Sequence, residues 1–398
     1  MLRTSYFILE GLNSFATVYY AYYLFFFMEK TFGFGNKANL ALAATYGAIY
    51  TVCAWSGGKF AERFGYFTAL KLGFATMIVA LLAGAQVNSA SGQIVVMAFI
   101  VVGMCCTWPT LEALVSHDAT PSDLPKAVGI YNVVWAGTGA LSYFVGGAML
   151  DKLGLKSLFY VPAAIISAQL AFTVWLEAKA RSLNNPPASF SQETATDPPA
   201  LNPRPIAKAK SFLRMAWLAN PFAYIAINTI IALMPGIAGR LNLSTTFAGL
   251  FGSIWCFTRV GAFFALWFCP AWHYRFRWLL ASFLAMIASF AVILLIPNLA
   301  VLAVAQLVFG TAVGLIYYSS LFYSMDISEK KGEHGGIHEA AIGLGNCVGP
   351  AIGAASLHFL PTQSNSGALA VSGLLVLGLG GLLLIWRLGR RQIPLPPG

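Results

Sequence analysis

The chain alternates between long apolar stretches and short polar connections that contain glycine, proline and charged residues. An α-helix of about 20 apolar residues is long enough to cross the hydrocarbon core of a bilayer. The apolar and polar residues do not alternate one by one along short segments, as they would in a membrane β-barrel. The pattern therefore predicts an all-α membrane protein.

The predicted helices fall into two sets of six. Those of the first half cover residues 6–28, 38–58, 66–87, 93–115, 127–150 and 158–178. Those of the second half cover residues 215–238, 247–268, 278–297, 299–323, 336–359 and 366–387.

Residues 179–214 form the longest polar stretch and separate the two sets. This stretch contains the pairs Pro186-Pro187 and Pro198-Pro199 and few aliphatic residues, so it cannot bury enough apolar surface to offset the entropy of ordering. We predict a linker at 179–214 between an N-terminal bundle at 1–178 and a C-terminal bundle at 215–390, with a tail at 391–398.

Composition supports a membrane protein and orients it. Hydrophobic residues make up 58% of the chain and charged residues 10%, whereas about a quarter of a soluble domain is charged. The net charge of +10 comes from Lys and Arg in the termini, the linker and alternate connections. This asymmetry predicts that both termini face the cytoplasm, in the cytoplasmic (inner) membrane. We therefore expect a lipid bilayer as the partner, with no nucleic acid and a monomeric chain.

The two halves share short sequence matches in the same order and at nearly constant spacing. Residues Asn13–Ala16 match Asn220–Ala223, Gly47 matches Gly252, and Gly137 matches Gly343. Such a repeat is typical of transporters in which two similar bundles enclose a site near the bilayer midplane and rock about it.

The connection after the second predicted helix reads Gly-Gly-Lys-Phe-Ala-Glu-Arg-Phe-Gly-Tyr from Gly57. It resembles the G-x-x-x-D-R-x-G-R-R signature of the major facilitator superfamily, although it has Glu for Asp and lacks the closing basic pair. The resemblance implies twelve helices in two pseudo-symmetric bundles and a cytoplasmic latch formed by Gly58, Glu62, Arg63 and Gly65. We expect Gly58 to allow close backbone approach, Glu62 and Arg63 to pair with neighbouring helix ends, and Gly65 to permit a tight turn. The alternative is an ordinary short basic loop.

The eleventh predicted helix carries small residues at steps of four. Gly345, Gly349 and Gly353, with Pro350 beside them, form a groove that allows another helix to pack closely. The resembled exporters have such a Gly-Pro motif in the fifth helix instead, so here the motif favours a packing role over a role in export.

Ionisable residues inside a membrane are costly and are candidates for function. Arg259 lies in the middle of the eighth predicted helix, and a buried guanidinium needs an anion. That anion is either Glu10 or Glu112 in a structural ion pair, or the carboxylate or phosphate of a solute. Some organic-anion members of the resembled family use an arginine on this helix, which favours the solute.

Glu10 and Glu112 are also candidates for proton coupling. A buried carboxyl group binds a proton more readily, and a nearby arginine favours the ionised form, so a change of neighbour could load and release a proton. The alternative is a carboxylate that reaches interfacial water.

The loop that enters the eleventh predicted helix, Glu333–Glu339, contains His338 and Glu339, which we consider a possible gate or proton relay. The alternatives are a solvated loop and a metal site, which the two glycines before His338 disfavour. The asparagines Asn13 and Asn228 and the tyrosines Tyr317 and Tyr318 lie on helices that line the central cavity of the resembled family. Tyr19 and Tyr23 belong to the same group. Packing is the alternative for each residue alone, whereas together they predict a cavity for a small organic solute.

These observations favour a secondary active transporter of a small organic solute, with organic anions among the candidates, driven by protons and working by alternating access. The alternatives are a broad-specificity drug or metabolite exporter working by proton antiport, and a non-transporting sensor or assembly partner. We do not expect an enzyme or a cofactor, because the glycine-rich segments lack the spacing of phosphate-binding and dinucleotide-binding loops.

Overall fold

The computed structural model describes residues 2–116, 124–182, 206–327 and 331–391. Within them the side chains of residues 2, 116, 124, 125, 128, 206, 207, 325–327, 331–338 and 391 are not described. Regular structure in these residues consists of helices, without strands. The predicted all-α fold is confirmed.

The described residues of the first half form six long helices. They are α1 (Leu2–Phe32), α2 (Asn36–Phe64), α3 (Tyr66–Gly84), α4 (Ala90–Ser116), α5 (Leu124–Leu153) and α6 (Ser157–Ser182).

In the part of the second half that the structure describes, there are seven α-helices and one short 3₁₀-helix, η1 (Pro270–Trp272). The α-helices are α7 (Ile206–Arg240), α8 (Thr245–Gly252), α9 (Ile254–Phe268), α10 (Phe276–Leu295), α11 (Leu299–Ile327), α12 (Lys331–Phe359) and α13 (Ser366–Arg391). Helices α8 and α9 together form a single crossing that is interrupted at Ser253. The described helices therefore correspond to twelve membrane crossings.

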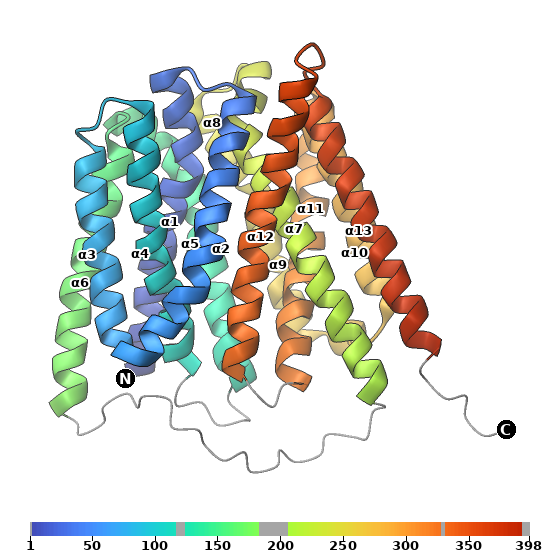
Figure 1. The fold of residues 1–398 in the computed structure, drawn as a ribbon, viewed down its shortest axis with the longest axis horizontal. Helices are drawn as coiled ribbons and strands as arrows, with labels where there is room; N and C mark the ends of the chain where they lie inside the picture. The colour runs from blue at the N-terminus through green and yellow to red at the C-terminus, as the bar shows by residue number, and fades with distance from the viewer. Residues whose placement is uncertain (1, 117–123, 183–205, 328–330, 392–398) are drawn as a thin grey trace.

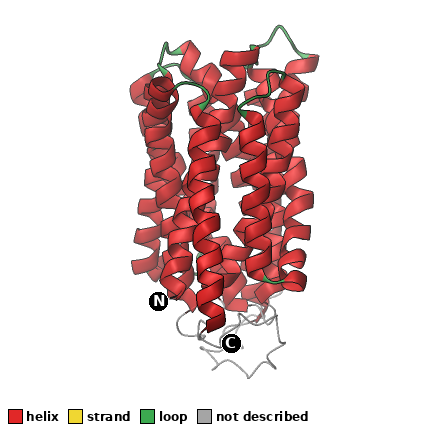
Figure 2. Ribbon diagram, turned by 90° about the vertical axis from the view of Figure 1, so that its left-hand side faces the viewer, coloured by secondary structure: helices red, strands yellow, loops and turns green. Residues whose placement is uncertain are grey.

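The helices run side by side in one bundle (Figures 1 and 2). Helices α1–α6 lie mainly on one side of Figure 1, and α7 and α9–α13 on the other. Helix α1 begins and α13 ends at the same end of the bundle, which we call the terminal end; α8 lies at the opposite end, which we call the distal end.

Ten spans in the described residues are long and apolar enough to cross a membrane by length and composition alone. Helices α1 and α2 are not among them, because polar residues such as Glu10, Asn13 and Asn39 interrupt their apolar sequence. These polar side chains are buried against neighbouring helices, so protein contacts rather than lipid surround them.

Several helices extend beyond their predicted ends. Helix α6 continues to Ser182 and α7 begins at Ile206, so both ends of the stretch predicted as a linker are helical; the rest of it lies outside the described residues. The Ala, Lys and Arg residues at these ends are strong helix formers. Helix α12 begins at Lys331, so His338 and Glu339 lie within a helix and not in a loop. The two glycines before His338 are accommodated in its first turns.

Two prolines, one in α4 and one in α12, lie near the places where these helices pack most closely against α2. Pro109 in α4 and Pro350 in α12 lack a backbone N–H, which removes the helical hydrogen bond to the carbonyl four residues earlier. Those carbonyls belong to Cys105 and Asn346, and each lies against a glycine of α2: Cys105 against Gly57, and Asn346 against Gly47. A side chain at either glycine would overlap the neighbouring backbone.

The small residues of α12 pack on two different helices. Gly345 and Gly349 lie against α7 at Pro221 and Ile225, whereas Gly353 lies near Leu40 of α2. The predicted groove therefore does not receive a single helix, because α12 lies between α2 and α7 and changes its neighbour along its length.

Candidate functional site

Arg259 occupies a buried position between the two halves. It lies on α9 with 8% of its surface exposed. Its guanidinium carbon lies 4.6 Å from the ring centre of Trp135, on α5 of the first half, and 5.0 Å from that of Trp255, on α9. The charge is held between two indole faces, which attract cations through their quadrupoles.

No carboxylate neutralises this arginine in the part of the chain that the structure describes. No ion pair or hydrogen bond connects the guanidinium to the described residues, and its Nε atom is buried without a partner. The ion pair of Arg259 with Glu10 or Glu112, one of the two alternatives, is therefore not formed in the described residues, because the arginine lies over the two indole rings instead. A buried, uncompensated cation is costly, so the position favours a solute anion.

Aromatic rings surround the arginine on the side of Trp135. Tyr317 on α11 stacks on Trp135 with the ring centres 5.4 Å apart. Trp108 on α4 packs edge-on against the same indole at 6.0 Å. Phe263 joins Tyr317 to Tyr318, at 5.7 and 5.9 Å. We call this group, with Arg259 and Trp255, the central site. It combines one charge with flat apolar surfaces from both halves.

Amide side chains lie on the helices around the central site. Asn228 on α7 donates a hydrogen bond to Asn346 Oδ1 on α12. Asn13 on α1 and its counterpart in the repeat, Asn220 on α7, are both buried, and neither amide has a partner in the described residues. Buried amides without partners are uncommon in proteins, so Asn13 and Asn220 stay candidates for contact with solute or water.

Three carboxyl groups form a second polar cluster. Glu10 on α1, Glu112 on α4 and Glu339 on α12 lie within electrostatic range of one another. Ser14 donates a hydrogen bond to Glu10 Oε1 at 2.8 Å, whereas Glu10 Oε2 is buried without a partner. The hydroxyl of Tyr50 on α2 donates to Glu339 Oε2 at 2.7 Å, so the cluster connects the two halves. The side chain of His338 lies outside the described residues.

A polar group joins the two halves at the distal end. Asp151 at the end of α5 accepts hydrogen bonds from the backbone N–H and the hydroxyl of Thr246 at 2.8 and 2.9 Å. Lys30 of α1 donates to Asp151 at 3.2 Å and also to Thr245. Close backbone contact between Gly147 and Thr245 accompanies these bonds. The distal ends of α1 and α5 are therefore bound to α8.

The latch residues are not engaged in comparable contacts. Space around Gly58 is open, and the close approach occurs at Gly57 instead. Glu62 and Arg63 are exposed and form no ion pair within the described residues, which differs from the expected pairing with helix ends. Gly65 has a φ of 92°, which allows the tight turn between α2 and α3.

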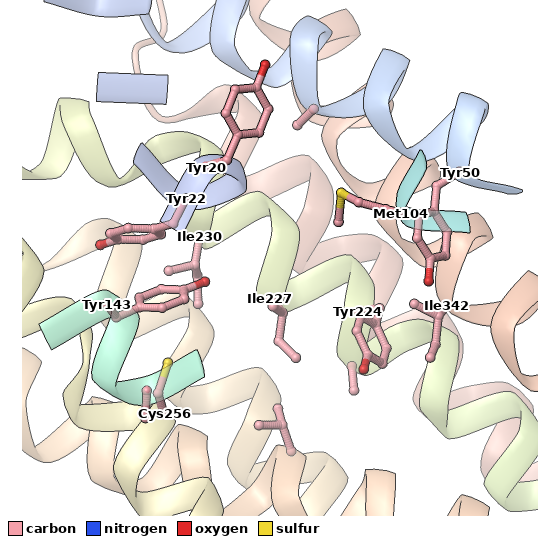
Figure 3. Packing of buried hydrophobic residues seen from close by; sticks show 14 of the residues in the cluster. Tyr20, Tyr22, Tyr50, Met104, Tyr143, Tyr224, Ile227, Ile230, Cys256 and Ile342 are labelled. Carbon is pink, nitrogen blue, oxygen red and sulfur yellow. The ribbon is translucent and has the colours of Figure 1, made fainter. Parts of the chain in front are cut away.

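Tyr19 and Tyr23 pack within the structure and do not join the central site. Tyr19 hydrogen-bonds Ser157 Oγ at 2.9 Å, and Tyr23 donates to the carbonyl of Tyr143 at 2.6 Å. Tyr22 lies against the ring of Tyr143, 3.9 Å between centres, as Figure 3 shows. The same view places Tyr50 and Tyr224 on the opposite side of the buried cluster.

The sequence reading did not select several residues of these sites. Trp108, Trp135 and Trp255 were missed because tryptophans are also common in helix packing. Tyr50 and Asn346 were missed because their polar partners lie on distant parts of the chain. The spacing of Trp255 and Arg259 could have indicated their contact, because residues four apart lie on the same face of a helix. No group of three or more metal-binding side chains occurs in the described residues.

Comparison with protein families identifies one match: the profile of the Major Facilitator Superfamily matches residues 6–350. No curated protein sequence matches the chain.

Solved structures share the fold at low sequence identity. The nucleoside transporter NupG has a TM-score of 0.71 at 15% identity, over 97% of this chain and 99% of that one. The human organic anion transporter TETRAN has a TM-score of 0.66 at 14% identity, over 96% and 98% of the two chains. A peptide transporter solved in complex with sulfate has a TM-score of 0.73 at 14% identity, over 98% and 95%.

Proposed function

Because the chain belongs to the major facilitator superfamily, we propose that it is a secondary active transporter that moves a small organic anion by alternating access. The observation that carries this proposal is Arg259, which is buried between the halves without a carboxylate partner in the described residues. An anionic solute supplies the missing counter-charge. The carboxylate or phosphate of the solute accepts hydrogen bonds from the guanidinium.

The aromatic rings of the central site indicate the chemistry of the rest of the solute. Trp135, Tyr317 and Trp108 come from three helices and present flat apolar surfaces next to the charge. Such surfaces favour a solute with a planar or apolar part beside its anionic group. The solved structures that share the fold include an organic anion transporter, a nucleoside transporter and a peptide transporter.

In this proposal the cluster of Glu10, Glu112 and Glu339 binds and releases the coupled proton. Glu10 has a free carboxylate oxygen in a buried position, which is suited to hold a proton. Glu339 accepts its hydrogen bond from Tyr50, which belongs to the other half. Rocking of the two halves would change this contact and thereby the proton affinity of the cluster.

The distribution of Lys and Arg along the chain indicates how the protein is oriented in the membrane. Lys and Arg concentrate in the connections at the terminal end, so this end faces the cytoplasm and the protein lies in the cytoplasmic membrane. The contacts of Lys30, Asp151 and Thr246 then close the site on the outer side.

Solute counterflow in proteoliposomes tests the proposal. A panel of aromatic and aliphatic carboxylates and phosphate esters is screened first by thermal shift, because a bound ligand stabilises the folded protein. Wild-type protein is expected to exchange at least one anion, and Arg259→Gln to lose most of this exchange. Arg240→Gln is the matched control, because Arg240 donates to the carbonyl of Leu294 near the distal end, away from the central site.

The same liposomes test the coupling and the alternatives. Anion flux that responds to an imposed pH gradient in wild type, but not in Glu10→Gln or Glu112→Gln, supports proton coupling; flux indifferent to the gradient refutes it. An Arg259→Ala protein that still moves lipophilic cations favours the drug exporter. A folded wild-type protein that exchanges no solute favours the non-transporting sensor.

A further inference from the structure

A pocket of about 250 Å³ opens at the terminal end of the second half, away from the central site. It lies between α7, α10 and α13 and is lined by Lys208, Ser211, Phe212, Met215, Tyr274, Phe276, Trp386, Gly389 and Arg390. Helices α7 and α13 approach closely beside it, where a side chain at Gly389 would meet the hydroxyl of Ser211. The pocket is smaller than the 300–1,000 Å³ or so of cavities that enclose a whole drug-sized ligand. It therefore fits a part of a larger molecule.

The two charges in the lining are both positive. Lys208 lies on the first turn of α7 and Arg390 on the last turn of α13. Neither side chain forms an ion pair or hydrogen bond with the described residues. The guanidinium of Arg390 lies 5.1 Å from the ring centre of Trp386, which limits its movement. The lining thus presents two cations to a common opening and includes no acidic residue.

Aromatic rings make the walls of the pocket rigid and apolar. Phe276 stacks on Trp386 at 4.5 Å with an interplanar angle of 11°, which joins α10 to α13. Phe212 packs edge-on against Tyr274 at 5.4 Å. The backbone N–H of Tyr274 donates to the hydroxyl of Tyr323 at 3.0 Å. A soluble anion needs no such apolar walls, whereas an amphiphilic one does.

Large apolar side chains are exposed on the outer surfaces of α10 and α13, two of the helices that border the pocket. Leu388 and Leu384 of α13 are 49% and 57% exposed, and Trp278 of α10 is 42% exposed. In a bilayer this surface contacts acyl chains, and a tryptophan near a helix end is typical of the interface. The basic pocket therefore lies between helices whose outer faces contact lipid.

We propose that this pocket binds the phosphate head group of an anionic phospholipid from the leaflet at the terminal end. Lys208 and Arg390 contact the phosphate, and the acyl chains extend into the bilayer that surrounds α10 and α13. Basic pockets between transmembrane helices are suited to such head groups. The lipid bridges the ends of α7 and α13, and it does so independently of the solute carried at the central site.

Native mass spectrometry of the purified full-length chain tests this proposal. Dioleoyl phosphatidylglycerol and dioleoyl phosphatidylcholine are titrated separately, and the lipid-bound fraction is measured. We expect the first to bind more tightly. The double variant Lys208→Gln/Arg390→Gln should weaken phosphatidylglycerol binding about 30-fold, from the loss of two cations near the membrane surface.

A matched double variant controls for net charge. Lys210→Gln/Arg387→Gln removes the same number of exposed cations from the same helices, outside the pocket lining, and should change phosphatidylglycerol binding less than threefold or so. Thermal denaturation of each variant without lipid confirms that it is folded. A third variant, Gly389→Leu, narrows the pocket without removing charge and should also weaken binding.

Three outcomes would overturn the proposal. The first is equal binding of the anionic and zwitterionic lipids by wild type. The second is an equal loss of phosphatidylglycerol binding in the pocket variant and the matched variant. The third is complete displacement of phosphatidylglycerol by millimolar inorganic phosphate, which would identify a soluble phosphate compound as the ligand.

Discussion

Adjacent glycines of α2 should respond in opposite ways to the same substitution. Gly57 lies against the carbonyl of Cys105 on α4, which Pro109 leaves without its helical hydrogen bond. A methyl group at Gly57 would overlap this backbone, and backbone cannot move aside as a flexible side chain can. At Gly58 no atom lies within 4 Å of an added methyl group.

The magnitudes follow from packing and helix propensity. Overpacking costs about 1–3 kcal/mol, and in a unit the size of the first half each kcal/mol shifts the melting temperature by about 2–4 °C. Gly57→Ala should therefore lower the melting temperature by about 2–12 °C. Gly58→Ala should leave it unchanged or raise it slightly, because alanine is favoured over glycine in a helix by up to about 1 kcal/mol.

Tryptophan fluorescence during heating in detergent measures both variants under identical conditions. Equal melting temperatures for Gly57→Ala and Gly58→Ala would refute the reasoning, because they would mean that α4 does not contact α2 closely at Gly57. Gly47→Ala extends the test to α12, where the overlap is with the backbone of Asn346.

Three further predictions concern polar and aromatic contacts. Asn346→Leu should cost about 1 kcal/mol, because it removes the Asn228–Asn346 hydrogen bond and leaves the Asn228 amide only its 3.3 Å bond to the carbonyl of Tyr224. The double variant with Asn228→Leu should be closer to wild type in thermal stability; additive losses would contradict this. Asp151→Asn should cost about 1–2 kcal/mol of stability, because it weakens the hydrogen bonds to Thr246 and Lys30, and should therefore lower the melting temperature below that of Asp151→Glu, which keeps the charge. An unchanged melting temperature would show that this distal contact does not hold the halves together. Trp135→Leu should weaken solute binding more than Trp135→Phe, because cation–π attraction to Arg259 contributes about 0.5–2 kcal/mol; equal affinities would assign Trp135 a packing role alone.

The sequence alone was sufficient for the architecture, because each crossing is encoded locally. Twenty or so apolar residues bounded by polar ones specify a membrane helix without reference to the rest of the chain. Helix ends were less predictable: α7 begins at Ile206 and α12 at Lys331, since residues outside the membrane can continue a helix when their propensity allows it. The interruption at Ser253 between α8 and α9 was not foreseen.

Side-chain partners could be predicted only in part. Arg259 was recognised because any charge within an apolar helix is conspicuous, but its contacts were not, because Trp135 is brought to it by the packing of the two halves. The same limit explains why Gly58 rather than Gly57 was expected to make the close approach. Which of the two glycines makes the contact depends on which face of α2 meets α4. The sequence around them does not distinguish the two positions.

The central claim is that Arg259 binds the anionic group of the transported solute. Isothermal titration compares one solute identified in the counterflow screen with its neutral methyl ester, using wild type, Arg259→Gln and the Arg240→Gln control. Wild type and the control should bind the acid at least tenfold or so more tightly than the ester, whereas Arg259→Gln should bind the two about equally. If folded Arg259→Gln kept the full preference for the acid, Arg259 would not be the group that binds the anion.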